Sequence, residues 1–302
     1  PASFGAVLMP VCYRPSAVSL VLAILLGSAA TLTAAQQFSL NVDSQSNLYA
    51  SGHATSSITP VGGGTLPPYV TLQAGTSRSL TFSSVTGSVS YNDVDAPPAY
   101  LGQYNGPDGG AVNFQDASWP DDFLTTSTPP GLLPPSAAGS PTTFYMDMDS
   151  LNGISGLSLY ESTPSDRRVM FLAGTFTTSA QPQDPAPSSL DFSSNGLTMS
   201  FTQLSPVLNQ LFFIGDGLTG TGTGTTQTFI VPDQATHLYL GIVDGSYFVG
   251  GPDYYDNNRG SFNVAGAVVP EPSTWLAIGG AGILSLAAGA ARRARRSVKQ
   301  RT

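Results

Sequence analysis

The chain has few residues that could support thiolate or imidazole chemistry. Its 302 residues include one cysteine, Cys12, and two histidines, His53 and His237. A single cysteine forms no intramolecular disulfide and no thiolate metal site. No Ser/His/Asp order and no phosphate-binding loop appears among the other residues. We therefore expect a protein that is not an enzyme and that folds without covalent cross-links.

Basic residues are scarce between the two ends of the chain. Residues 36–270 hold 18 acidic residues and four arginines, which gives a net charge of −14. A body this acidic does not bind nucleic acid by neutralising phosphates, but it suits cation binding and solubility outside the cell. Seventeen of the 18 acids are aspartate, a residue of turns and calcium sites more than of helices.

Long stretches of helical periodicity are absent, whereas Gly, Pro, Ser and Thr are abundant. This pattern predicts an all-β, jelly-roll-like β-sandwich over residues 67–267, preceded by a Ser/Gly/Thr-rich extension at 36–66. Long loops are expected at 92–142 and 177–189, and the Gly/Thr alternation of 219–228 predicts a flexible loop. The expected strands are 38–42, 69–72, 79–83, 87–91, 156–160, 169–176, 197–201, 210–214, 226–231, 236–243 and 260–265.

The first 35 residues have the pattern of a secretory signal peptide. Arg14 precedes an apolar run at 17–30, and Thr33-Ala34-Ala35 would allow cleavage before Gln36. Cys12 would leave with this segment. We expect the protein to be exported.

Residues 275–291 are 17 residues without a charge. As a helix with a rise of about 1.5 Å per residue they would span roughly 25 Å, enough for a thin bilayer core. Four arginines follow, and the positive-inside bias would keep such a cluster cytoplasmic. These features fit either an ordinary membrane anchor or an exposed motif that a processing enzyme grips beside a removable helix.

Together, residues 268–302 resemble the PEP-CTERM sorting signal of Gram-negative bacteria, in which a Pro-Glu-Pro motif, an apolar helix and an arginine cluster follow one another. The resemblance implies recognition by an exosortase-type membrane protease, transient anchoring in the inner membrane and loss of the helix. It also implies delivery to the cell surface or to an exopolysaccharide or biofilm matrix. The residues that carry it are Pro270, Glu271, Pro272, Ser273, Arg292, Arg293, Arg295 and Arg296.

The sharpest internal pattern is an aspartate at the end of one expected strand and two asparagines before the last one. Asp244 follows strand 236–243, and Asn257 and Asn258 precede strand 260–265. Carboxylate, amide and carbonyl oxygens are the ligands that Ca²⁺ takes, six to eight in number. The alternative is a polar turn that enters a strand, because Asp and Asn favour turns.

Asp244 and the stretch Asn257-Asn258-x-Gly260-Ser261-Phe262 resemble the calcium-dependent galactose-binding lectins of the bacterial PA-I type. Residues 87–91 are similar to an early strand of that family, and 106–109 to the Gly-Pro-x-Gly that follows it. The resemblance implies calcium ligation by the side chains of Asp244, Asn257 and Asn258 and by the carbonyls of Tyr91 and Tyr254. Sugar hydroxyls would complete the calcium shell.

This sequence departs from the lectin pattern by a longer loop before Asn257, long insertions in the middle and the lack of the family's histidine after residue 109. The nearby polar residues Asn113 and Gln115, together with Tyr255, join Asp244 and Asn258 as expected ligand-contacting residues. The sequence thus predicts a calcium-dependent module that binds an extracellular glycan.

Two alternatives remain open. One is a structural matrix or surface protein in which calcium only fixes a loop. The other is a secreted hydrolase that uses two carboxylates, either Asp121 with Asp122 or Asp147 with Asp149.

Overall fold

The computed structural model describes residues 34–57, 59–91, 104–110, 144–161, 168–245 and 248–270. Within these ranges every named element is a β-strand or a short 3-10 helix, so the expected all-β class is confirmed. None of the helices in these ranges is long and apolar enough to cross a membrane. The expected signal peptide and sorting helix lie outside the described residues.

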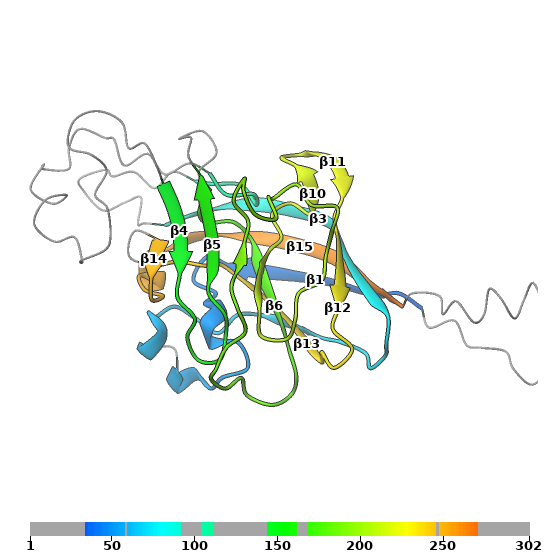
Figure 1. The fold of residues 1–302 in the computed structure, drawn as a ribbon, viewed down its shortest axis with the longest axis horizontal. Helices are drawn as coiled ribbons and strands as arrows, with labels where there is room; N and C mark the ends of the chain where they lie inside the picture. The colour runs from blue at the N-terminus through cyan, green and yellow to red at the C-terminus, as the bar shows by residue number, and fades with distance from the viewer. Residues whose placement is uncertain are drawn as a thin grey trace, which may run out of the picture. The chain divides into compact units, whose positions relative to one another are not determined.

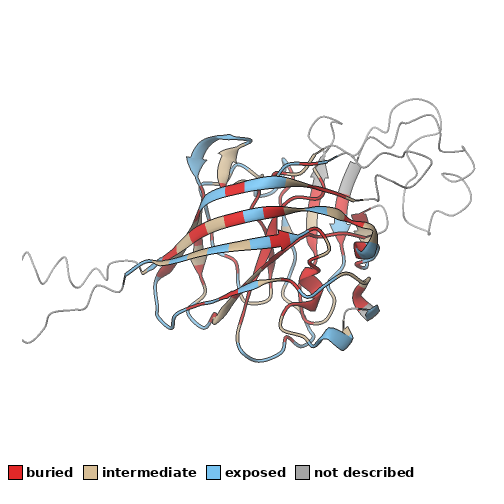
Figure 2. Ribbon diagram, turned by 180° about the vertical axis from the view of Figure 1, so that it is seen from behind, coloured by how far each residue is buried: buried red, intermediate tan, exposed pale blue. Residues whose placement is uncertain are grey.

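The largest sheet has five strands and contains the longest strands of the fold (Figure 1). In spatial order the strands are β1 (Gln36–Asp43), β15 (Arg259–Pro270), β3 (Arg78–Ser90), β12 (Thr228–Val231) and β8 (Gln203–Leu204). More buried and less buried residues alternate along β1 and β15 and over the first five residues of β3, because successive side chains point to opposite faces (Figure 2). One face of the sheet therefore covers the core.

Two four-stranded sheets and one hairpin complete the described strands. The second sheet consists of β2 (Tyr69–Thr71), β13 (His237–Gly241), β6 (Ala173–Thr177) and β9 (Leu211–Phe213). The third consists of β14 (Val249–Gly250), β4 (Phe144–Met148), β5 (Leu157–Glu161) and β7 (Leu190–Asp191), and the hairpin of β10 (Leu218–Gly220) and β11 (Thr223–Thr226). The 3-10 helices are η1 (Leu48–Ala50), η2 (Thr55–Ser57), η3 (Thr59–Val61) and η6 (Tyr255–Asn257).

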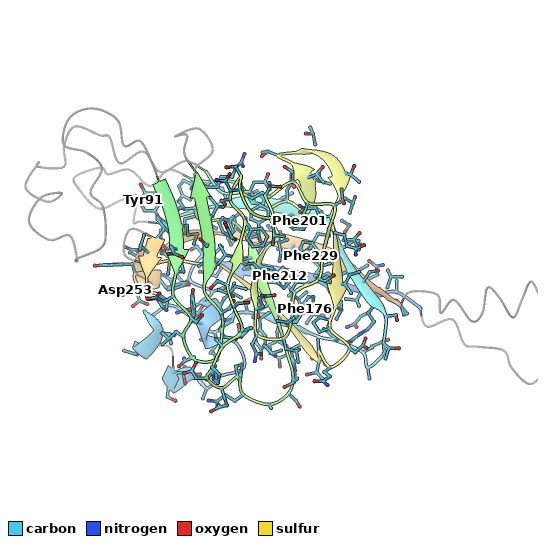
Figure 3. The ribbon with its side chains drawn as sticks, in the orientation of Figure 1. Tyr91, Phe176, Phe201, Phe212, Phe229 and Asp253 are labelled. Atoms are coloured by element: carbon cyan, nitrogen blue, oxygen red, sulfur yellow. The ribbon has the colours of Figure 1, made fainter. Side chains whose placement is uncertain are left out.

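A chain of aromatic rings joins the first sheet to the second. Phe212 of β9 lies 5.3 Å from Phe229 of β12, measured between ring centroids, and stacks on Phe176 of β6 at 5.1 Å. Phe201 approaches Phe229 edge-on at 5.7 Å. The four rings meet in the middle of the described fold (Figure 3). The two sheets therefore share one apolar core, and each ring pair adds about 0.5–1.5 kcal/mol beyond the burial of its area.

The N-terminal stretch 36–66, which the sequence sets apart as an extension, is part of the same fold. Strand β1 pairs with β15 along its whole length, from Gln36 opposite Val268 to Asp43 opposite Ser261. The three residues of η1 are fully buried in the core. The boundary expected at residue 67 is therefore wrong.

Three other expectations change. The strands predicted at 79–83 and 87–91 are one continuous β3, in which Gly87 has a φ of 111°. A Cβ at Gly87 would collide with the carbonyl of Ser261 on β15, so glycine here permits close strand pairing and does not mark a turn. No strand forms at 197–201, where Thr198 has a φ of 57°. The loop expected at 219–228 holds the β10–β11 hairpin.

Candidate metal site

The candidate site lies where three strands end. The buried–intermediate alternation of β13 stops at Leu240, and the chain from Leu240 to Gly245 is buried throughout, so Asp244 lies in the interior. Antiparallel pairing places Arg259, the first residue of β15, opposite Ser90 of β3. The ladder ends at this pair, so Asn258 precedes β15 and Tyr91 follows β3 at the same end of the two strands. The sequence thus brings one carboxylate, two neighbouring amides and the end of β3 to one end of the fold.

The loop between Asp244 and Asn257 is closed at its base. Gly245 forms a bridge with Pro252, and the Asp253 N–H donates to the Asp244 carbonyl at 3.3 Å. The fully buried Tyr255 accepts a hydrogen bond from the Asp244 N–H and donates its hydroxyl to the Ile242 carbonyl, both at 3.1 Å. Tyr255 therefore ties the 254–258 turn to the end of β13. Its ring is not available for stacking on a ligand, so its expected ligand-contacting role is corrected.

Three side-chain oxygens at the site are buried and have no hydrogen-bond partner: Asp244 Oδ2, Asn257 Oδ1 and Asn258 Oδ1. Their other polar atoms are partly satisfied, since Asp244 Oδ1 accepts from the Gly245 N–H at 2.7 Å and Asn258 Nδ2 donates to the Ser44 carbonyl at 3.1 Å. Each buried, unpaired polar group costs about 1–3 kcal/mol. These are the same three side chains that the sequence predicts as metal ligands.

Burial makes the Asp244 carboxylate energetically costly. The side chain is 2% exposed, and desolvation raises its pKa to about 7. The adjacent Asn258 amide and the Gly245 N–H partly offset this rise in pKa, whereas the negative charge of Asp253 adds to it. A divalent cation beside the carboxylate would reverse this balance, because it favours the ionised form.

The two aromatic residues expected to contribute carbonyls both lie at this end of the fold. The Tyr91 ring packs edge-on against Phe248 of the loop, with ring centroids 6.1 Å apart. Tyr254 has a φ of 65° and a ψ of 11°, the left-handed conformation that costs a non-glycine residue of order 1–3 kcal/mol. Its side chain is 53% exposed. In Figure 3, Tyr91 and Asp253 both lie at the end of the fold away from the central phenylalanines.

The donor set is made of hard oxygen ligands. In the described part of the chain no three His, Cys, Asp or Glu side chains gather in a cluster that could hold a metal. The predicted ligand set instead combines one carboxylate with two amide oxygens and two backbone carbonyls. Such a set suits Ca²⁺, whereas Zn²⁺ and the other transition metals prefer imidazole or thiolate.

Several residues around the site were not singled out by the sequence. Asp253 lies beside Asp244, and Asp256 Oδ1 accepts from the Gly64 N–H at 2.8 Å. Ser44 and Gln45 reach the 256–258 turn from the end of β1. Their separation of more than 200 residues from the turn leaves no local sequence signal.

The remaining sequence-predicted residues divide into two groups. Pro270 is the last residue of β15 and stands opposite Arg78. Asp147 lies on β4, where burial and then the charge of Asp149 raise its pKa. The residues outside the described ranges are Asn113, Gln115, Asp121, Asp122, Glu271, Pro272, Ser273, Arg292, Arg293, Arg295 and Arg296.

The chain matches no protein-family model, no curated protein and no solved structure.

Proposed function

We propose that the protein is an exported module that binds calcium at the Asp244/Asn257/Asn258 site and uses the ion to hold a glycan of the extracellular matrix. The single observation that carries this proposal is the coincidence of predicted ligands with buried, unpartnered oxygens. Eleven buried side-chain atoms of the described residues have no hydrogen-bond partner, and three of them are the predicted side-chain ligands. A hard cation is the partner that all three share.

The coordination chemistry is consistent with calcium. Three side-chain oxygens and the carbonyls of Tyr91 and Tyr254 would supply five of the six to eight ligands that Ca²⁺ takes. The remaining positions would be open to water or to neighbouring hydroxyls of a sugar. The half-exposed ring of Tyr254 offers an apolar surface next to those positions, on which a sugar ring could pack.

The fold and the tail support the same proposal. Two sheets that share an aromatic core suit the jelly-roll-like β-sandwich of the PA-I type lectins. Strand β15 leads directly from the site to Pro270, the first residue of the sorting motif. Sorting by an exosortase-type protease would place the module at the cell surface or in the matrix.

A second function is favoured by one observation. Asp244 and Asn258 are only 2% and 1% exposed, so a cation there could serve the fold without touching a ligand. The protein would then be a structural matrix protein stabilised by calcium.

Calcium titration followed by a glycan array separates these functions. With one formal charge among its ligands, the site should bind with a Kd of about 10⁻⁴–10⁻³ M, the range of extracellular modules. At a calcium concentration of about 10 mM the folded state should gain about 1.4–2.7 kcal/mol, a rise in Tm of roughly 3–10 °C. An unchanged midpoint would refute the metal site.

The array is repeated with Asn258→Ala and with the exposed control Asn195→Ala. Glycan binding that requires calcium, is lost in Asn258→Ala and persists in Asn195→Ala would support the lectin function. A calcium-dependent Tm without any glycan binding would favour the structural function.

A further inference from the structure

The segment after β1 forms hydrogen bonds with the turn that carries Asn257 and Asn258. This segment consists of residues 44–47 and 61–65, and we name it the N-terminal clasp. We propose that the clasp, through Gln45 and Ser44, is the positioning device of the calcium site. The inference rests on the proposed calcium binding, and it assigns a role to residues that the sequence places in a separate extension.

Gln45 reaches the backbone on both sides of Asn257. Its Nε2 donates to the Asp256 carbonyl at 2.9 Å and to the Asn258 carbonyl at 3.3 Å. The backbone of Gln45 is itself fixed, because its N–H donates to Asp43 Oδ1 at 2.8 Å and its carbonyl accepts from the Thr65 N–H at 2.7 Å. The side-chain amide of Gln45 thus bonds to both ends of the turn, and the Gln45 backbone is held in place by its own hydrogen bonds.

Ser44 sets the orientation of the Asn258 amide. The Ser44 carbonyl accepts from Asn258 Nδ2 at 3.1 Å, and the Ser44 N–H donates to the Gly260 carbonyl at 3.0 Å. An acceptor on the nitrogen side directs the amide so that Oδ1 is left without a protein partner. That oxygen is the one a cation needs.

Residues 61–65 of the clasp also form hydrogen bonds with the turn, at Tyr255 and Asp256. The Gly64 N–H donates to Asp256 Oδ1 at 2.8 Å, and the Tyr255 N–H donates to the Gly62 carbonyl at 3.3 Å. Gly63 has a φ of 80°, which favours glycine, and a Cβ there would also displace the Asp256 carboxylate.

Asn47 in turn holds this glycine loop. The Asn47 side chain donates to the carbonyls of Val61 at 2.7 Å and Gly63 at 3.0 Å. The side-chain oxygen of Asn47, Oδ1, accepts from the Tyr49 N–H at 3.0 Å. Both parts of the clasp are therefore fixed before any ligand binds.

Arg259 also donates to the carbonyls of Asp256, at 3.2 Å, and Asn258, at 2.9 Å. The turn therefore keeps one donor on each carbonyl when Gln45 is replaced. Loss of a residue that forms a hydrogen bond with a metal ligand usually weakens metal binding roughly 10- to 100-fold. With Arg259 still in place, we expect the lower end of this range for Gln45.

The test compares Gln45→Met with Gln37→Met, a control at an exposed glutamine on β1. The full-length proteins are purified in detergent, and calcium affinity is measured by calorimetry alongside the Tm in EDTA. Gln45→Met should bind calcium about tenfold more weakly than wild type, whereas Gln37→Met should bind as wild type does. A Gln45→Met protein with wild-type affinity would overturn the inference, even if its Tm in EDTA falls, because that is the signature of a structural role alone.

Hydrogen exchange in the wild type gives a second test that does not depend on a variant folding. Calcium should slow exchange of the clasp amides as well as those of residues 253–260, because an ion that binds the folded turn also opposes local opening of the clasp bonded to it. Protection confined to 253–260 would overturn the inference. A wild type that binds no calcium would instead refute the proposed function, so the two failures are distinguishable.

Discussion

Replacing Asp244 with asparagine should stabilise the calcium-free protein while it abolishes the response to calcium. Asparagine has nearly the same shape as aspartate but carries no charge. In the calcium-free protein the buried Asp244 carboxylate has one oxygen without a partner, and burial raises its pKa from 3.8 to about 7. Above pH 7 the folded state therefore holds a buried charge that the unfolded state exposes to water.

The size of the effect follows from the pKa. A shift of about three units corresponds to roughly 4 kcal/mol of destabilisation above pH 7, at about 1.4 kcal/mol per unit. The amide nitrogen that replaces a carboxylate oxygen needs a hydrogen-bond acceptor. A buried donor without one costs about 1–3 kcal/mol, which reduces the stabilisation by that amount. The net stabilisation should be about 1–3 kcal/mol near pH 8, which raises the Tm by roughly 2–12 °C for a domain of this size.

The pH dependence of this effect has a defined direction. Between the unfolded pKa near 3.8 and the folded pKa near 7, the folded state binds a proton that the unfolded state does not. The destabilisation caused by Asp244 therefore becomes smaller as the pH falls from about 8 towards 4. The free energy of unfolding should rise by roughly 3 kcal/mol between about pH 8 and pH 5 from this group. The Asp244→Asn variant carries no titrating group at this position, so its advantage over wild type in EDTA should shrink as the pH falls.

The assay is thermal melting in EDTA at about pH 8 and about pH 5, and in about 10 mM calcium at the higher pH. Asp149→Asn, at an exposed aspartate just after β4, serves as the control for removal of a negative charge. If Asp244→Asn is less stable than wild type in EDTA at the higher pH, or if it still gains stability from calcium, the burial and the ligand role inferred for Asp244 are wrong.

Three further predictions concern other parts of the chain. Calcium affinity should fall as the pH drops below about 7, because the ion requires ionised Asp244, and calorimetry above and below that pH measures this. Arg78→Met should lower the free energy of unfolding by about 2–4 kcal/mol in urea, since the buried guanidinium donates to four carbonyls, those of Gln73, Pro232, Asp233 and Ala235. An equal effect from Arg168→Met would contradict that assignment. Glu271→Ala should block processing of the tail, seen as retention of the full-length chain in the membrane fraction; normal release would count against the sorting signal.

The sequence predicts the parts of the site that are encoded locally. Asn257 and Asn258 stand next to each other just before β15, and Asp244 follows β13, so pattern and ligand chemistry together are sufficient to propose them. Gln45 could not be found in this way. Its contact with Asp256 joins residues 211 positions apart, and an isolated glutamine after a strand has no distinctive pattern.

The errors in the fold have similarly specific causes. Residues 197–201 have the apolar character of a strand, but an aspartate turn dominates locally. Asp191 Oδ1 accepts from the Ser193 N–H at 2.9 Å, and the Asp191 carbonyl accepts from the Leu197 N–H at 2.8 Å. Side-chain capping of this kind competes with strand pairing and cannot be weighed from apolar pattern alone.

Strand β15 also has a mechanical consequence. It begins at Arg259, directly after the site, ends at Pro270, and is paired with β1 on one side and β3 on the other. Its 12 residues extend over about 40 Å. If the protein is tethered by its tail and holds a polymer at the site, tension runs along this strand. The hydrogen bonds to both neighbours stand perpendicular to that tension and share the load at once, so the strand resists being peeled out bond by bond.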